Sequence, residues 1–131
     1  MGRVFFNTRE NVHALTGAYE VLASDSGKLF LVSQAAAYTI TLPTEQEGLN
    51  FKFMCNAAAS NDVKIDGGES NAIKGQAFDP TTGINAIDNN MVKFASGAAA
   101  VGDIIELHCD GTDWLCIAHS GGTNGIVGAN S

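Results

Sequence analysis

The feature that most restricts the fold of this chain is the alternation of apolar and polar residues within short segments. In residues 38–42 (YTITL) and 49–55 (LNFKFMC) every second side chain is apolar, which is the period of a strand with one buried face. Cys55 then becomes a small core residue. Pro43 ends the first segment, since proline cannot donate a ladder hydrogen bond. A helical period is not sustained anywhere, so the sequence predicts an all-β fold.

A tight hairpin is the clearest local prediction. Asp110 and Gly111 separate two apolar segments, residues 102–109 and 114–119, and Asp-Gly between apolar segments is a strong hairpin signal. Trp114, the only tryptophan, is expected in the core. About ten such strands in one chain of 131 residues predict a single-domain, jelly-roll-like sandwich or barrel.

Three parts follow from this pattern: an N-terminal arm (1–18), a β-sandwich or barrel domain (19–119) and a flexible C-terminal tail (120–131) with at most one short strand. Residues 76–90 carry Pro80 and Gly83 and show no period, which predicts a long surface loop. The short segments 62–66 and 71–74, which end at glycines, are expected at edges or corners of a sheet.

Val4, Phe5 and Phe6 make the start of the arm apolar, although they lie outside the regular pattern. Free termini usually carry polar residues, so an apolar start is expected to dock. Its own domain, a neighbouring subunit and a larger surface are all open as the docking partner.

Charge and composition exclude several classes of partner. The formal net charge is -7, and the seven basic residues are scattered, which disfavours binding to a phosphate backbone. Apolar runs stay well short of the roughly 20 residues that cross a bilayer, so we expect no membrane anchor. Three cysteines without a CxxC motif, in a chain that begins without a signal-peptide core, predict cytoplasmic synthesis with reduced thiols.

The candidate nucleophiles and metal ligands cluster on the predicted hairpin. His108 precedes Cys109 directly, and neighbours on a strand point to opposite faces. Cys116 and His119 also have opposite parity, so at most two of these four residues converge on one face. Their spacing fits no zinc module. We therefore predict no catalytic residues and no metal site, and free thiols.

The acidic residues give no better support for an enzyme. Most lie in or beside turns, where aspartate caps its own backbone in solvent: Asp62, Asp66, Glu69, Asp103, Asp110 and Asp113. The ligand series of a calcium loop and the pattern of a phosphate loop are both missing from the sequence. We predict no cofactor and no enzymatic activity; a hydrolase on this scaffold would need a convergent pair of catalytic groups.

Several of these segments together resemble the capsid decoration (head cement) proteins of tailed bacteriophages. They are 23–31 (ASDSGKLFL), 38–43 (YTITLP), 48–53 (GLNFKF), 101–107 (VGDIIEL) and 110–114 (DGTDW). The resemblance covers roughly residues 23–118 and implies a homotrimer on the capsid exterior that binds the major capsid protein. It also implies synthesis in the host cytoplasm. On this view Val4, Phe5 and Phe6 anchor the arm to the shell.

The same resemblance keeps a second function open. Related modules occur in phage fibres and spikes, and the Asp-Gly-Thr-x-Trp hairpin at residues 110–114 appears in short repeats of tail fibres. A receptor- or glycan-binding module of a tail fibre or spike is therefore the alternative. The chain lacks the long repeats of a fibre shaft.

Overall fold

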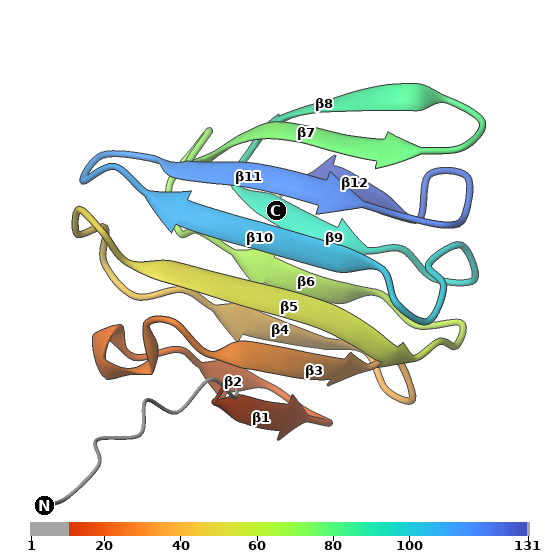
Figure 1. The fold of residues 1–131 in the computed structure, drawn as a ribbon, viewed down its shortest axis with the longest axis horizontal. Helices are drawn as coiled ribbons and strands as arrows, with labels where there is room; N and C mark the ends of the chain where they lie inside the picture. Colours follow the sequence, from red (N-terminus) through yellow and green to blue (C-terminus); the bar gives the residue numbers. More distant parts are fainter. Residues whose placement is uncertain (1–10, 131) are drawn as a thin grey trace, which may run out of the picture.

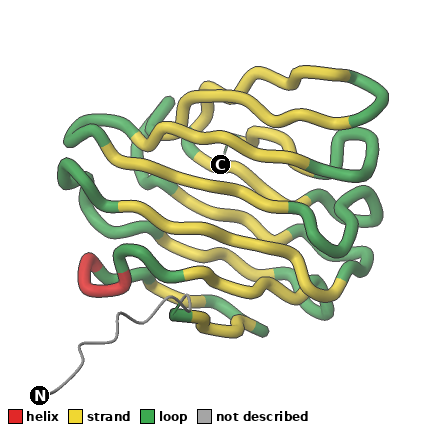
Figure 2. Tube along the Cα trace, viewed as in Figure 1, coloured by secondary structure: helices red, strands yellow, loops and turns green. Residues whose placement is uncertain are grey.

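The computed structural model describes residues 11–130, which form two mixed β-sheets packed face to face as a sandwich (Figure 1). The helical part of these residues is one turn of 3-10 helix, η1 (Ala23–Asp25), drawn in red in Figure 2. The predicted all-β sandwich is thus confirmed.

The larger sheet, called sheet A, contains seven strands. In spatial order they are β1 (Val12–Leu15), β3 (Leu29–Ser33), β5 (Asn50–Ala57), β10 (Ile104–Cys109), β11 (Trp114–His119), β7 (Ile73–Asp79) and β8 (Gly83–Asn89). The smaller sheet, called sheet B, contains five strands. They are β12 (Ile126–Ala129), β9 (Met91–Phe94), β6 (Val63–Asp66), β4 (Tyr38–Thr41) and β2 (Tyr19–Glu20).

The first seven strands alternate between the two sheets. β1, β3 and β5 lie side by side and parallel in sheet A, and β2, β4 and β6 do the same in sheet B. The chain therefore winds around the core, and each winding adds one strand to each layer. β7 breaks the series, since it lies beyond the β10–β11 hairpin and pairs in parallel with β11. This winding differs from the antiparallel order of a jelly roll.

The core lies between the sheets and is rich in aromatic side chains. Leu49, Phe51, Phe53 and Cys55 are all buried, which confirms the predicted inward face of residues 49–55. Trp114 is also fully buried, as predicted, and its ring lies 5.7 Å from that of Phe51. Burial of these large side chains removes apolar area from water and stabilises the fold.

Residues 76–90 do not form the predicted surface loop. They belong to β7 and β8, which pair antiparallel at one edge of sheet A. Alternate positions point inward, as the burial of Ala77 and Ile87 shows. The glycines and Pro80 concealed this period because they also signal turns. Gly75 has a different role: a Cβ there would collide with the carbonyl oxygen of Cys116 on the adjacent β11.

The structure also differs from the prediction at edges and ends. β6 and β7 are interior strands, each paired on both sides, whereas edge or corner positions were expected. Residues 12–15 of the predicted arm form β1. Residues 126–129 form β12, the one short strand that the prediction allowed in the tail, and it is paired with β9 as part of sheet B. The domain therefore begins before residue 19 and extends beyond residue 119. Val4, Phe5 and Phe6 lie outside the described residues.

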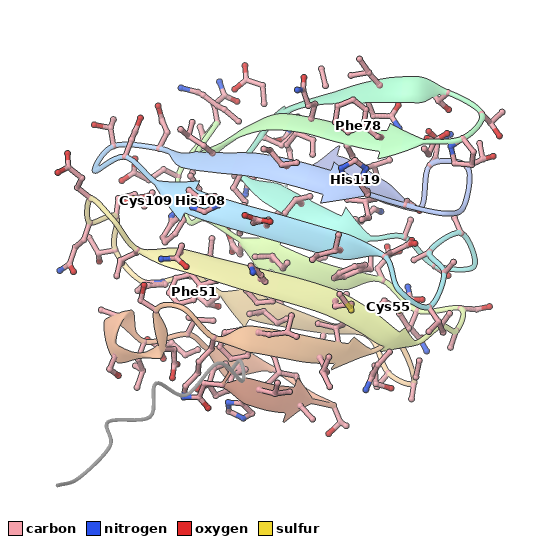
Figure 3. The ribbon with its side chains drawn as sticks, in the orientation of Figure 1. Phe51, Cys55, Phe78, His108, Cys109 and His119 are labelled. Carbon is pink, nitrogen blue, oxygen red and sulfur yellow. The ribbon has the colours of Figure 1, made fainter. Side chains whose placement is uncertain are left out.

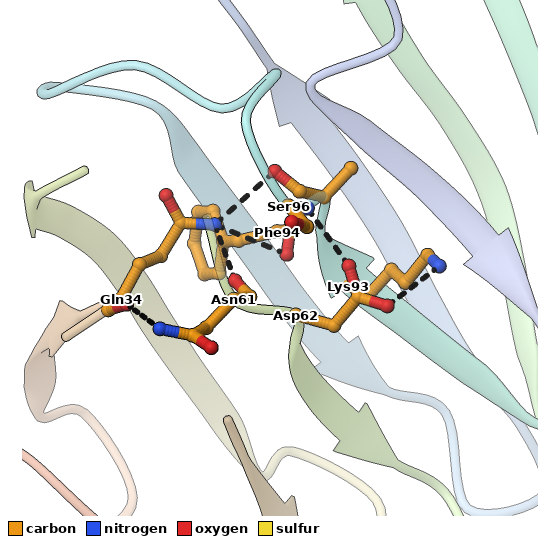
Figure 4. A network of polar contacts seen from close by, with 7 residues as sticks. Gln34, Asn61, Asp62, Lys93, Phe94 and Ser96 are labelled. Carbon is orange, nitrogen blue, oxygen red and sulfur yellow. Dashed lines mark hydrogen bonds and ion pairs between the residues drawn. The ribbon is translucent and has the colours of Figure 1, made fainter. Parts of the chain in front are cut away.

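One buried amide joins three connections at the same end of the sandwich (Figure 4). Gln34, fully buried after β3, donates through Nε2 to the carbonyl oxygen of Asn61 at 2.9 Å and to those of Phe94 and Ala95. Its Oε1 accepts the N–H of Ala59 at 3.1 Å. Since buried polar groups without partners are costly, Gln34 holds the β3–β4, β5–β6 and β9–β10 connections together.

We expect Gln34→Ala to lower the free energy of unfolding by about 2–4 kcal/mol, because it leaves several buried polar groups without hydrogen-bond partners and opens a void. Urea denaturation followed by circular dichroism measures the change. Gln46→Ala, at an exposed position, is the matched control and should change stability by less than about 0.5 kcal/mol. Equal stabilities for the two variants would contradict the role of Gln34.

Candidate docking surface

The histidines and cysteines of the β10–β11 hairpin lie on opposite faces of sheet A, as predicted. His108 and His119 are exposed, whereas Cys109 and Cys116 point into the core (Figure 3). His108 Nε2 lies 2.8 Å from the Oε1 of Glu106. Across residues 11–130 the structure brings together no group of three or more His, Cys, Asp or Glu side chains suited to a metal ion. The prediction that the chain is not an enzyme stays a prediction.

The three thiols are buried. The strand register places Cys109 opposite Trp114 and Cys116 opposite Leu107, so the two cysteines of the hairpin are not directly paired. Burial raises the pKa of Cys116 to about 12 and also raises the pKa of Cys55. Because the thiolate is the reactive form, both groups are poor nucleophiles at neutral pH.

Two of the six acidic residues singled out from the sequence, Asp66 and Asp110, cap their own turns as predicted. Asp66 accepts the N–H of Gly68, and Asp110 accepts those of Thr112 and Asp113. Asp103 was predicted to be a solvated turn residue, but it is buried. Its carboxylate accepts the hydroxyl of Ser120 at 2.6 Å and the N–H groups of Ala100 and Gly121. These contacts are structural: they bind the β9–β10 connection to the segment after β11.

The outer face of sheet A carries a feature that the sequence did not reveal. One line of side chains, directly opposite one another on successive strands, crosses the sheet from edge to edge and is apolar or aromatic throughout. We call this line the apolar row; in spatial order it consists of Ala14, Leu31, Met54, Ile104, His119, Phe78 and Ile84.

The side chains of the apolar row point away from the core, because they alternate along each strand with buried residues. Ile84 at one end is 61% exposed, and Ile117, which lies next to the row on β11, is 51% exposed. Near the same end the rings of Phe78 and His119 stack with their centroids 5.1 Å apart (Figure 3). The row is thus a line of apolar and aromatic side chains on the molecule's exterior, with the imidazole of His119 as its polar member. In soluble proteins an exposed apolar patch commonly marks a contact site.

Charges on this face cancel. Lys52 is opposite Glu106 in the register, and Lys74 is opposite Asp88, so each acidic side chain on the outward positions of sheet A faces a lysine. The chain as a whole has a formal net charge of -7. The acidic excess therefore lies elsewhere, and the apolar row sits in a locally neutral surface.

The outer face of sheet B is different in character. Its central row is polar from Thr39 through Lys64 to Lys93 and ends at Val127 on β12. An open hollow of about 410 Å³ lies at one end of this face, lined by Ala37, Tyr38, Thr39, Asp62, Lys64 and Ser96. The hydroxyl of Tyr38 is already engaged, since it donates to the carbonyl oxygen of Ser33 at 2.9 Å. Its ring lines the hollow but also packs against the core. Asp62 accepts a hydrogen bond from Lys93 at 3.1 Å and the N–H of Ser96 at 2.8 Å (Figure 4).

Comparison with known proteins adds no assignment. The chain matches no protein-family model and no curated protein sequence. Within the described part of the chain there is no helix long and apolar enough to span a membrane. Among the surfaces of the sandwich, the outer face of sheet A has the most distinctive chemistry.

We expect all three thiols to react with a disulfide reagent at least about a hundredfold more slowly in the native protein than in denaturant. The reason is that the native protein must open locally or unfold before the reagent can reach a buried thiol. Absorbance of the released thiolate measures the rate. Thr41→Cys, at an exposed position on sheet B, is the positive control and should add one fast thiol. Rapid reaction of a native cysteine would contradict the assignment of all three to the core.

Acid should destabilise the protein. Hydrogen bonds from backbone N–H groups lower the pKa of Asp62, Asp79 and Asp110 below the usual 3.8. The pKa of each of these carboxyl groups is lower in the folded protein than in the unfolded chain. Each group therefore stabilises the fold fully at pH values above its unfolded-state pKa, and this stabilisation is lost as the pH falls through its folded-state pKa. We expect the Tm to fall between about pH 4 and about pH 2, and Asp110→Asn to reduce that fall. A Tm that stays constant over this range would contradict the prediction.

Proposed function

We propose that this chain is a structural virion protein that binds the exterior of a phage capsid as a homotrimer and stabilises the contacts between capsomers. The observation that carries the proposal is the apolar row on a neutral face of an otherwise acidic sandwich. A flat row that crosses seven strands suits a protein surface, whereas small-molecule sites are concave.

The winding of the chain supports a structural role. Because the first seven strands alternate between the sheets, the connections between them tie one layer to the other, and the buried Gln34 fixes three connections together. A scaffold of this kind transmits force without changing shape. Stiffness is useful in a protein that holds capsomers in place, since several weak contacts then act together.

The arm is the proposed contact with the major capsid protein. Asn11 is held at the edge of sheet A, where its carbonyl oxygen accepts the N–H of Leu29 at 3.0 Å. Val4, Phe5 and Phe6 therefore precede a fixed attachment point and supply the apolar anchor. In this proposal the protein is made in the host cytoplasm, ends on the outside of the virion and needs no cofactor, nucleic acid or membrane.

The hollow on sheet B favours a second candidate, a receptor- or glycan-binding module of a tail fibre or spike. Sugars bind to shallow sites that combine an aromatic ring with polar groups, and Tyr38, Asp62 and Lys64 provide both. This candidate leaves the apolar row of sheet A without a role, which is why capsid decoration is preferred.

Removal of residues 1–10 should abolish binding to the capsid and leave the fold intact, because Asn11 and the pairing of β1 are retained. The measurement is co-sedimentation with undecorated, expanded heads of the phage that encodes the protein, over a range of protein concentrations. The full chain should saturate the heads at a fixed stoichiometry and raise their resistance to heat. Circular dichroism of the truncated chain checks the fold.

A triple change of Val4, Phe5 and Phe6 to serine should reproduce the loss, whereas Asn7→Ala with Thr8→Ala is the matched control and should bind normally. Retained binding of the truncated chain would overturn the role of the arm. A full chain that ignores the heads but binds on a glycan array, and loses that binding with Tyr38→Ala, would favour the fibre module.

A further inference from the structure

The loop between β11 and β12 contains the only Asn-Gly pair of the sequence, Asn124 and Gly125. In an unfolded chain the backbone nitrogen of such a glycine readily attacks the side-chain amide of the asparagine, because no Cβ shields it and the backbone turns freely. We propose that Asn124 is a deamidation site, that the fold holds the reaction back, and that opening of this loop releases it. The reaction depends on neither capsid binding nor trimer formation.

Deamidation of Asn124 needs water and no other reactant. The backbone nitrogen of Gly125 loses its proton and bonds to the Cγ atom of Asn124. The bond from Cγ to the side-chain nitrogen breaks, and ammonia leaves. Water then opens the five-membered imide at one of its two carbonyl carbons and gives either aspartate or isoaspartate. Both products carry a carboxylate in place of the neutral amide.

The fold requires both residues at these positions. Asn124 has a φ of 55°, a left-handed conformation that asparagine adopts more readily than most residues. Gly125 is buried, and a Cβ there would collide with the Oγ atom of Ser120. That hydroxyl group is held in place, since it donates to Asp103 at 2.6 Å. The loop therefore imposes the residue pair that is most open to deamidation.

The contacts of the loop keep the two reacting groups apart. The N–H of Gly125 donates to the carbonyl oxygen of Gly122 at 3.0 Å, so the attacking nitrogen retains its proton. The N–H of Asn124 donates to Oδ2 of Asp79 at 3.1 Å. The carbonyl oxygen of Gly125 accepts the N–H of Ala95 at 2.8 Å. Because the backbone is fixed on both sides and Asn124 itself is exposed to water, the rate is set by opening of the loop.

Deamidation weakens the junction in which it occurs. The Nδ2 atom of Asn85 donates both to Oδ2 of Asp79, at 3.0 Å, and to Oδ1 of Asn124, at 3.2 Å. A carboxylate at position 124 shares this donor with the carboxylate of Asp79, and like charges at close range repel. Isoaspartate also lengthens the backbone by one atom just before the buried Gly125. The result is a one-way loosening of the loop that leads into β12.

The test is mass spectrometry of tryptic peptides after incubation of the full chain in mildly alkaline buffer, with and without guanidinium chloride. Deamidation at Asn124 should be at least about tenfold slower in buffer than in denaturant. Asn71 is the internal reference, because it is also exposed and has the same φ but is followed by Ala72. In denaturant Asn71 should react more slowly than Asn124. Equal rates for Asn124 in the two conditions, or no preference for Asn124 over Asn71 in denaturant, would overturn the proposal.

Two variants test the role of the anchor at Asp79. Asp79→Ala removes the acceptor of the Asn124 N–H and should raise the rate in buffer at least about fivefold. Asp88→Ala removes an exposed carboxylate from β8, is the matched control and should leave the rate unchanged. Circular dichroism checks the fold, and the wild-type comparison decides the proposal if Asp79→Ala fails to fold. An unchanged rate in a folded Asp79→Ala would contradict control by the loop.

The product can also be made directly. Asn124→Asp reproduces its charge and should lower the Tm at neutral pH by at least about 3 °C, because the new carboxylate faces that of Asp79. Asn71→Asp adds the same charge at an exposed position with the same φ and should lower the Tm less. Equal Tm values for the two variants would overturn the proposed loosening.

Discussion

Strand register is the constraint on which the rest of this molecule depends. Because side chains alternate between the two faces of a strand, a shift by one residue would exchange the core and the surface of that strand. The fixed register places Phe30 beside Phe53 in the core and, by the same hydrogen bonds, Leu31 beside Met54 on the exterior. The core and the apolar row are therefore two results of one pairing scheme, and neither can move without the other.

The sequence predicts what depends on neighbouring residues. Residues 49–55 and the Asp110-Gly111 hairpin were correctly foreseen, because alternation and turn chemistry are local properties. The strands in residues 76–90 were not foreseen. Glycine and proline within this segment occupy a strand and a tight turn, but in the sequence they look the same as the glycine and proline of a long loop. β1 was missed because four residues are too few for the alternation of a strand to be recognised.

The apolar row was invisible for a different reason. Each strand contributes a single residue to the row, and an isolated exposed residue such as Ile84 needs no explanation. Only the register, which joins residues as distant in the chain as Ala14 and Ile104, shows that these residues form one line. Pairings over such separations are determined by the tertiary fold, so local pattern cannot predict a surface made from one residue per strand.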